Sequence, residues 1–176
     1  MKKILVLNLV LFIFLTACKK DDDTPITINT TLSATEQFNL FPTSDTGTSS
    51  FTKSFDIDLS NADTQAYINQ IESIDITAIT YKLSDFSGDI TGTISGSIMY
   101  NDMLLTTFED LVVSEAAADG TVFEIITPET FSAIEESLNT SENATITIDF
   151  TAENPNDMMN FNITLGINVS IVTNTI

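Results

Sequence analysis

The side chains of this chain that could carry out chemistry are almost all carboxylates. The 176 residues include 25 Asp and Glu, six Lys and one Cys, with no His and no Arg, and the formal net charge is −19. Without His or Arg the chain cannot form a Ser-His-Asp triad, a Cys-His pair, a His-ligated zinc site or an arginine clamp on phosphate. The acidity also argues against nucleic acid as a partner, because that affinity comes mostly from Lys and Arg on phosphates. We therefore expect no enzyme active site and no cofactor.

Calcium is the metal that suits the remaining ligands, because it prefers carboxylate and carbonyl oxygens. Two predicted loops each carry two acids: Asp85 and Asp89 in the first, Glu153 and Asp157 in the second. Neither loop matches a known calcium-binding motif. A calcium-stabilised module is therefore an alternative and not the leading hypothesis.

The N-terminus has the parts of a secretory signal. Two positive charges in Met1–Lys3 precede Ile4–Leu15, which is apolar apart from Asn8. This apolar run is too short for a comfortable transmembrane helix, which needs about 20 residues. We expect residues 1–17 to be a cleaved leader.

The residues around the single cysteine sharpen this expectation. Leu15-Thr16-Ala17-Cys18 resembles a bacterial lipobox, and the resemblance implies cleavage before Cys18, a diacylglycerol on its sulfur and acylation of the new amine. The following Lys19-Lys20-Asp21-Asp22-Asp23 is similar to the start of Bacteroidota surface lipoproteins, where such residues act as an export signal. The resemblance implies an outer-membrane, lipid-anchored protein that faces the cell exterior. It implies a location and no activity.

The rest of the chain divides into a short acidic tether, residues 18–25, and one domain, residues 26–176. Its composition is rich in Thr and Ile, which are typical of β-strands. The clearest strand covers Phe51–Leu59, where every second residue is apolar apart from Lys53. We expect Lys53 to reach water at the strand end or to protect a sheet edge from further pairing. In Ile74–Leu83 the apolar face changes parity after Ala78, which predicts a β-bulge.

Glycines and short polar segments predict the connections between strands. Gly92 and Gly96 fall on the apolar face of Ile90–Tyr100 and indicate close approach of another element or a curved strand. Asn101-Asp102 is a candidate tight turn, and Ala118-Asp119-Gly120 carries a hairpin signal. We expect Tyr81 and Tyr100 to lie in the core.

Two short helices are predicted. The first follows Asn61-Ala62-Asp63 and extends to about Ser73, with apolar residues at helical spacing. The second, over 128–138, begins at Pro128 after a Thr cap. Its adjacent Glu135 and Glu136 diverge, so they cannot form the carboxylate pair of a glycosidase, and we expect both to face water.

The elements add up to a mainly β domain: an antiparallel β-sandwich of about eight strands with two short helices. A barrel is the other way to bury such strands. The order strand-helix-strand-strand occurs twice, which suggests an internal duplication with halves 26–113 and 114–176.

Three functional hypotheses follow. The leading one is a surface-anchored, non-enzymatic binding, adhesion or structural module. The second is a carrier that holds an apolar ligand in a cavity for which Gly92 and Gly96 make room. The third is the calcium-stabilised module. The lipobox resemblance implies the membrane as a partner through the lipid, and the residues do not identify a protein or glycan partner.

Overall fold

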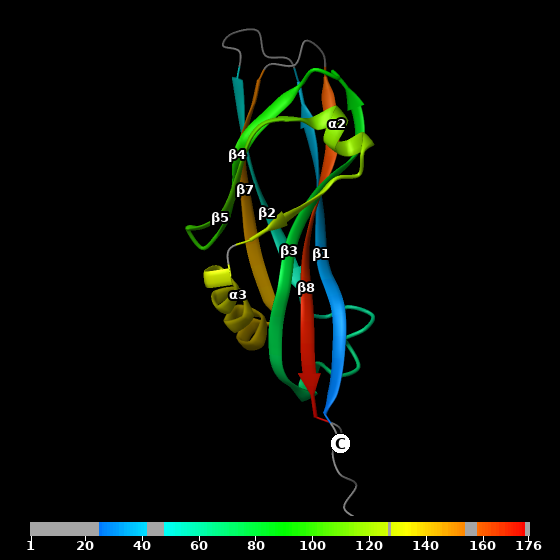
Figure 1. Cartoon of the computed structure of the whole chain (residues 1–176), viewed down its shortest axis with the longest axis vertical. Coiled ribbons are helices and arrows are strands. Elements are labelled where there is room, and N and C mark those ends of the chain that lie inside the picture. The colour runs from blue at the N-terminus through cyan, green and yellow to red at the C-terminus, as the bar shows by residue number, and fades with distance from the viewer. Residues whose placement is uncertain (1–24, 42–47, 127, 154–157, 175–176) are drawn as a thin grey trace, which may run out of the picture.

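The computed structural model describes residues 25–41, 48–126, 128–153 and 158–174. Within these ranges eight strands form two four-stranded antiparallel sheets that pack face to face (Figure 1). The first sheet has the order β1-β8-β3-β6. Its strands are β1 (Ile26–Leu40), β8 (Met159–Thr173), β3 (Ile71–Gly88) and β6 (Val122–Ile125).

The second sheet has the order β2-β7-β4-β5. Its strands are β2 (Thr48–Asp58), β7 (Asn143–Glu153), β4 (Thr93–Tyr100) and β5 (Met103–Val112). Successive strands of the chain mostly alternate between the sheets, and the resulting pair of orders is that of a jelly roll. The predicted antiparallel sandwich of eight strands is confirmed.

The strand order has an internal symmetry. Each strand number can be raised by four, with the count continuing from β8 to β1. The order β1-β8-β3-β6 then becomes β5-β4-β7-β2, which is the second sheet read from its other edge. The predicted repeat related β2, β3 and β4 to β6, β7 and β8, the same four-place shift. This symmetry divides the chain into halves between β4 and β5, whereas the predicted halves divide after residue 113. Descent from a duplicated half stays a prediction.

The core lies between the sheets and is built from the predicted alternation. Every second residue of β8 faces inward, and all of these inward side chains are buried. Phenylalanines from three strands meet in the core near the end where Leu40 pairs with Met159: the Phe38 ring lies 5.1 Å from that of Phe150 and 5.5 Å from that of Phe161. Such aromatic contacts fill the space between sheets that pack about 10 Å apart.

The change of parity in β3 is a bulge, as predicted. Ile76 pairs with Val169 and Ala78 with Asn168, so Thr77 is the extra residue. The bulge allows Ile74 and Ile76 before it, and Ile79 after it, all to be buried in the same core.

The predicted helix from Asn61 to about Ser73 is wrong. Turns occupy that segment up to Tyr67, followed by a single 3₁₀ turn, Ile68–Gln70. The Asn61 side chain accepts hydrogen bonds from the backbone N–H groups of Asp63 and Thr64, at 2.8 and 3.0 Å. These local bonds satisfy the backbone in a turn, which competes with a helix.

A short α-helix that was not predicted lies instead at Val113–Ala118 (α2). Asp119-Gly120 ends this helix and does not form the predicted hairpin. Gly120 has φ +60°, and the N–H of Thr121 bonds back to the carbonyl of Ala116 at 3.3 Å. A left-handed glycine with this bond is the Schellman ending of a helix.

The predicted helix at 128–138 is present as α3 (Pro128–Ser141). It lies beside β3 and β7, beyond the ends of the short strands β6 and β4, and closes that side of the sandwich (Figure 1). Two of its own side chains, Ile134 and Leu138, are fully buried.

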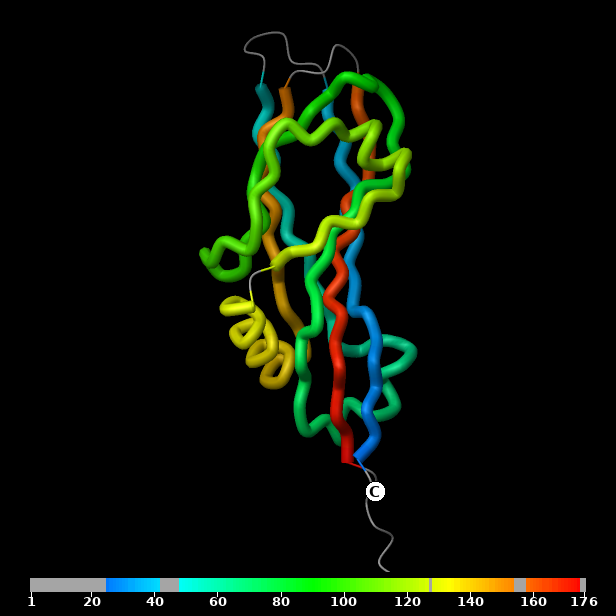
Figure 2. The backbone as a smooth tube through the Cα atoms, viewed as in Figure 1, coloured from blue at the N-terminus to red at the C-terminus, as the bar shows by residue number. Residues whose placement is uncertain are grey.

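The described chain starts and finishes at the same end of the sandwich. Ile26 at the start of β1 pairs with Thr173 at the end of β8, and Leu40 pairs with Met159 at the opposite end. We call these ends the N-terminal pole and the far pole. The segment between β2 and β3 lies beside the first half of β1, where Thr30 Oγ1 donates to Asp63 Oδ2 at 2.7 Å (Figure 2).

Candidate functional site

The predicted anchor lies outside the described residues. This applies to the leader, to Cys18 and to the export signal Lys19, Lys20, Asp21, Asp22 and Asp23. The described chain begins at Pro25, directly before the N-terminal pole. Within the described ranges there is no helix that has both the length and the apolar character to cross a membrane.

Among the described residues, the calcium candidates Asp85, Asp89 and Glu153 do not form a ligand cluster. Asp85 lies within β3, with φ +52°, and its Oδ2 accepts a hydrogen bond from Asn162 Nδ2 at 2.8 Å. Asp89 Oδ1 accepts from both the backbone N–H and the hydroxyl of Thr91, at 2.8 and 2.7 Å. Glu153 ends β7, and Asp157 is outside the described residues. Across the described ranges no group of three or more Asp, Glu, His or Cys side chains could hold a metal ion.

Gly96 in β4 and Gly92 directly before it do not open a ligand cavity, contrary to the expectation for a carrier. A Cβ on Gly96 would lie 2.2 Å from the carbonyl oxygen of Asp149, so the β7 backbone already fills that space. A Cβ on Gly92 would lie 2.6 Å from the sulfur of Met159. The other prediction for these glycines, close approach of a neighbouring element, is confirmed.

Tyr81 and Tyr100 are buried, as predicted. The Tyr81 ring stacks on that of Phe123 at 4.8 Å, and burial raises the pKa of its phenol. The Tyr100 hydroxyl donates to the carbonyl of Ala133 in α3 at 3.3 Å. Their positions explain them as core residues.

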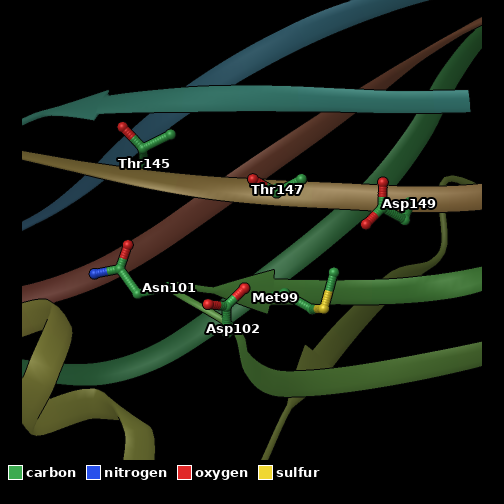
Figure 3. Close-up of a pocket in the computed structure, with 6 residues that line it drawn as sticks. All are labelled: Met99, Asn101, Asp102, Thr145, Thr147 and Asp149. Atoms are coloured by element: carbon green, nitrogen blue, oxygen red, sulfur yellow. The ribbon is translucent and has the colours of Figure 1, made fainter.

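An acidic surface covers the outer face of the second sheet. A hollow of about 370 Å³ lies there, and Figure 3 shows Thr145, Thr147 and Asp149 along β7 with Asp102 across from them on the β4–β5 turn. That turn is tight, as predicted: Asn101 and Asp102 have φ 45° and 64°. Hydroxyl and carboxylate oxygens make this a hydrogen-bonding surface of negative charge.

The outer face of the first sheet is different, and the sequence reasoning missed it. The outward positions of β1 and β8 carry no charged residue; we call them the uncharged face. They are Thr27, Asn29, Thr31, Ser33, Thr35, Gln37 and Asn39 on β1, with Asn160, Asn162, Thr164, Gly166, Asn168, Ser170 and Val172 on β8.

Side chains on the uncharged face bond across the strands. Thr31 Oγ1 donates to Asn168 Oδ1 at 2.7 Å, and the hydroxyls of Thr35 and Thr164 lie 2.8 Å apart. The signal was present in the sequence as polar residues at every second position. It required the pairing of β1 with β8, strands 119 or more residues apart along the chain, to be seen as one surface.

Comparisons with known proteins find similar solved structures and no family. No family model and no curated protein matches the chain. Among solved structures it is similar to the decameric BFDV capsid protein (8% identity, TM-score 0.44, 83% of this chain and 99% of the other). It is also similar to turnip yellow mosaic virus (9%, 0.42, 87% and 97%) and to FLHE (7%, 0.34, 84% and 98%). Our assignment of the fold rests on the strand order.

Proposed function

We propose that this chain is a lipoprotein of the outer membrane, anchored through Cys18, that acts on the cell exterior as a non-enzymatic binding, adhesion or structural module. The lipobox and the Lys-Lys-Asp-Asp-Asp segment support the location. The absence of His and Arg from the sequence supports a role without catalysis.

The observation that carries the proposal is the position of the N-terminal pole. The tether joins the domain at Ile26, which lies at the end of a strand of 15 residues. At about 3.3–3.4 Å per residue this strand spans about 50 Å. A lipid on Cys18 would therefore hold the N-terminal pole near the membrane, and both long sheet faces would extend away from it.

Replacement of the lipidated residue tests the anchor. Cys18→Ala should move the protein from the membrane fraction to the soluble fraction and abolish labelling by radioactive palmitate. Lys53→Ala, in the folded domain, is the control and should leave both unchanged. Retention of a cleaved Cys18→Ala protein in membranes would refute anchoring through Cys18.

Protease treatment of intact cells tests the direction in which the protein faces. The wild-type domain should be cleaved, whereas replacement of Lys19–Asp23 by alanines should protect it while leaving palmitate labelling intact. Full protection of the wild-type protein would contradict display on the exterior.

The described residues favour neither alternative function. Neighbouring atoms occupy the space beside Gly92 and Gly96, so these two glycines do not support a carrier. Native mass spectrometry would restore that hypothesis if an apolar ligand co-purified with the protein. A melting temperature that rises with millimolar calcium and falls with EDTA would restore the calcium hypothesis.

A further inference from the structure

The uncharged face is unusual for so acidic a protein. Protein surfaces typically carry charged residues at about 25–35% of positions, so fourteen outward positions should hold about four. The opposite sheet follows the expectation, with Asp56, Asp58, Asp149 and Glu153 among its outward residues. β1 and β8 themselves present only amides, hydroxyls, one glycine and one valine. The neighbouring strand β3 brings the Asp85 carboxylate to Asn162 and places Asp75 opposite Ser170.

Gly166 lies in the middle of this face, between the side chains of Thr80 and Thr31. Its φ is not in the left-handed region, and no backbone crowds it: the nearest atoms to an added Cβ are Thr80 Oγ1 at 3.0 Å and Thr31 Cγ2 at 3.3 Å. A glycine inside a strand weakens the strand, and such a residue often marks a place where a ligand approaches the backbone closely. Gly166 itself is buried, and the missing side chain leaves it at the bottom of a narrow opening between Thr80 and Thr31.

The opening belongs to a trough along β8. One hollow of about 260 Å³ is lined by Ser33, Thr164 and Gly166, among others, and a second of about 370 Å³ by Asn29, Thr77 and Asn168. Thr31 lines both hollows, so they adjoin. From Thr164 to Asn168 the trough follows the strand for about 14 Å.

The polar groups in the trough suit a ligand that both donates and accepts hydrogen bonds. The Thr31 hydroxyl donates to Asn168 Oδ1, which leaves the protons of Asn168 Nδ2 directed away from that bond. Threonine hydroxyls and asparagine amides can each donate and accept. On the rim, Lys82 of β3 lies diagonal to Glu124 of β6 on the same face, and their charges offset each other.

We propose that this trough binds a neutral polysaccharide chain, an inference that rests on the proposed surface-binding function. Sugar hydroxyls match the donors and acceptors of the trough. An acidic polymer would be repelled by the net charge of the protein. A protein partner or a second copy would need aromatic, Met or Arg residues at the centre of its interface, and the uncharged face has none.

Affinity electrophoresis tests the proposal with the whole chain after the leader, residues 18–176, carrying Cys18→Ser to keep it free of lipid. The gels contain dextran, laminarin, mannan or arabinoxylan as neutral probes and polygalacturonate as an acidic one. At least one neutral polysaccharide should retard the protein, with the same dissociation constant at 0.05 and 0.5 M NaCl, because no ion pair is involved.

Two variants should weaken that binding at least tenfold. Gly166→Thr fills the opening with a side chain of the surrounding type, and Ser33→Glu places a larger, charged side chain beside it without changing the glycine. Ser97→Thr and Thr147→Ala alter the outer face of the second sheet instead and should leave binding unchanged. Thermal unfolding shows whether each variant is folded, and Ser33→Glu serves if Gly166→Thr is not.

Four results would overturn the proposal: no retardation by any neutral probe, equal retardation of the trough variants, retardation by polygalacturonate alone, or self-association that the trough variants abolish. The last would assign the face to a second copy. None of them bears on whether Cys18→Ala releases the protein from membranes. Failure of the anchor, in turn, would leave binding by the purified chain intact.

Discussion

Lys53 Nζ lies 2.8 Å from Glu36 Oε2, and the two residues join edge strands of different sheets, β2 and β1. The ammonium also lies 5.4 Å from the centre of the Phe38 ring. Each side chain is more than one-third exposed, at 39% for Lys53 and 37% for Glu36. Lys53 therefore does not simply extend to water at the end of its strand, as expected from sequence; it closes one side of the sandwich.

The first prediction concerns this ion pair. Lys53→Met and Glu36→Gln should each lower the free energy of unfolding by no more than about 1 kcal/mol, because exposed ion pairs are screened by water and salt. Urea unfolding of both single variants and the double variant gives the coupling energy, expected near 0.5 kcal/mol in low salt and smaller in 0.5 M NaCl. A coupling that salt does not change would show that packing, and not charge, links the two residues.

The second prediction concerns Gly96. Gly96→Ala should destabilise the domain by about 1–3 kcal/mol, because the new methyl group meets the backbone of β7. Gly166→Ala is the matched control, since its methyl group meets only threonine side chains, and it should cost less than about 1 kcal/mol. Equal melting temperatures of the two variants would contradict the close approach at Gly96.

The third prediction concerns Glu135, which was expected to face water. Its Oε1 accepts a hydrogen bond of 2.7 Å from the backbone N–H of Ile76. β6 pairs with β3 only from Ile79 to Lys82, so this amide lies beyond the reach of β6. Glu135→Ala should cost about 1–2 kcal/mol and speed hydrogen exchange at Ile76, since it leaves the amide without that acceptor.

Two further variants in α3 test whether the lost hydrogen bond causes the loss of stability. Glu135→Gln keeps an acceptor and should retain most of the stability. Glu136→Ala removes an exposed neighbouring carboxylate and should change neither stability nor exchange. If Glu136→Ala matched Glu135→Ala, helix charge and not the hydrogen bond would be responsible.

The fourth prediction concerns pH. Burial raises the pKa of the Tyr81 phenol, so ionisation is harder in the folded than in the unfolded chain, where it occurs near pH 10. The stability is therefore unaffected below about pH 10 and falls as the pH rises through the folded-state pKa. Tyr81→Phe should remove this part of the alkaline loss, measured as the difference in urea midpoint between pH 8 and pH 11. An identical loss in the variant would exclude Tyr81 as its source.

The sequence predicted the structure best where a local pattern had only one structural explanation. The change of parity in β3 could only be a bulge, and Asn101-Asp102 between alternating strands had to turn. It failed for β1, which extends from Ile26 to Leu40, because Thr30 and Glu36 interrupt the apolar pattern on its inward face. Their partners, Asp63 and Lys53, come from other elements, and no pattern in the nearby sequence indicates these contacts. The uncharged face was missed for the same reason, since it exists only when β1 pairs with β8.

The pairing of Ile26 with Thr173 also determines how the domain would bear a mechanical load. A cell held by a ligand on this protein would pull on the tether, and the force would enter β1 at Ile26 along the direction of that strand. The hydrogen bonds between β1 and β8 run perpendicular to the strands. Force along β1 would shear all fifteen residue pairs together and would not peel them apart in turn. With β1 as the loaded strand, the jelly roll would resist detachment of the cell under flow.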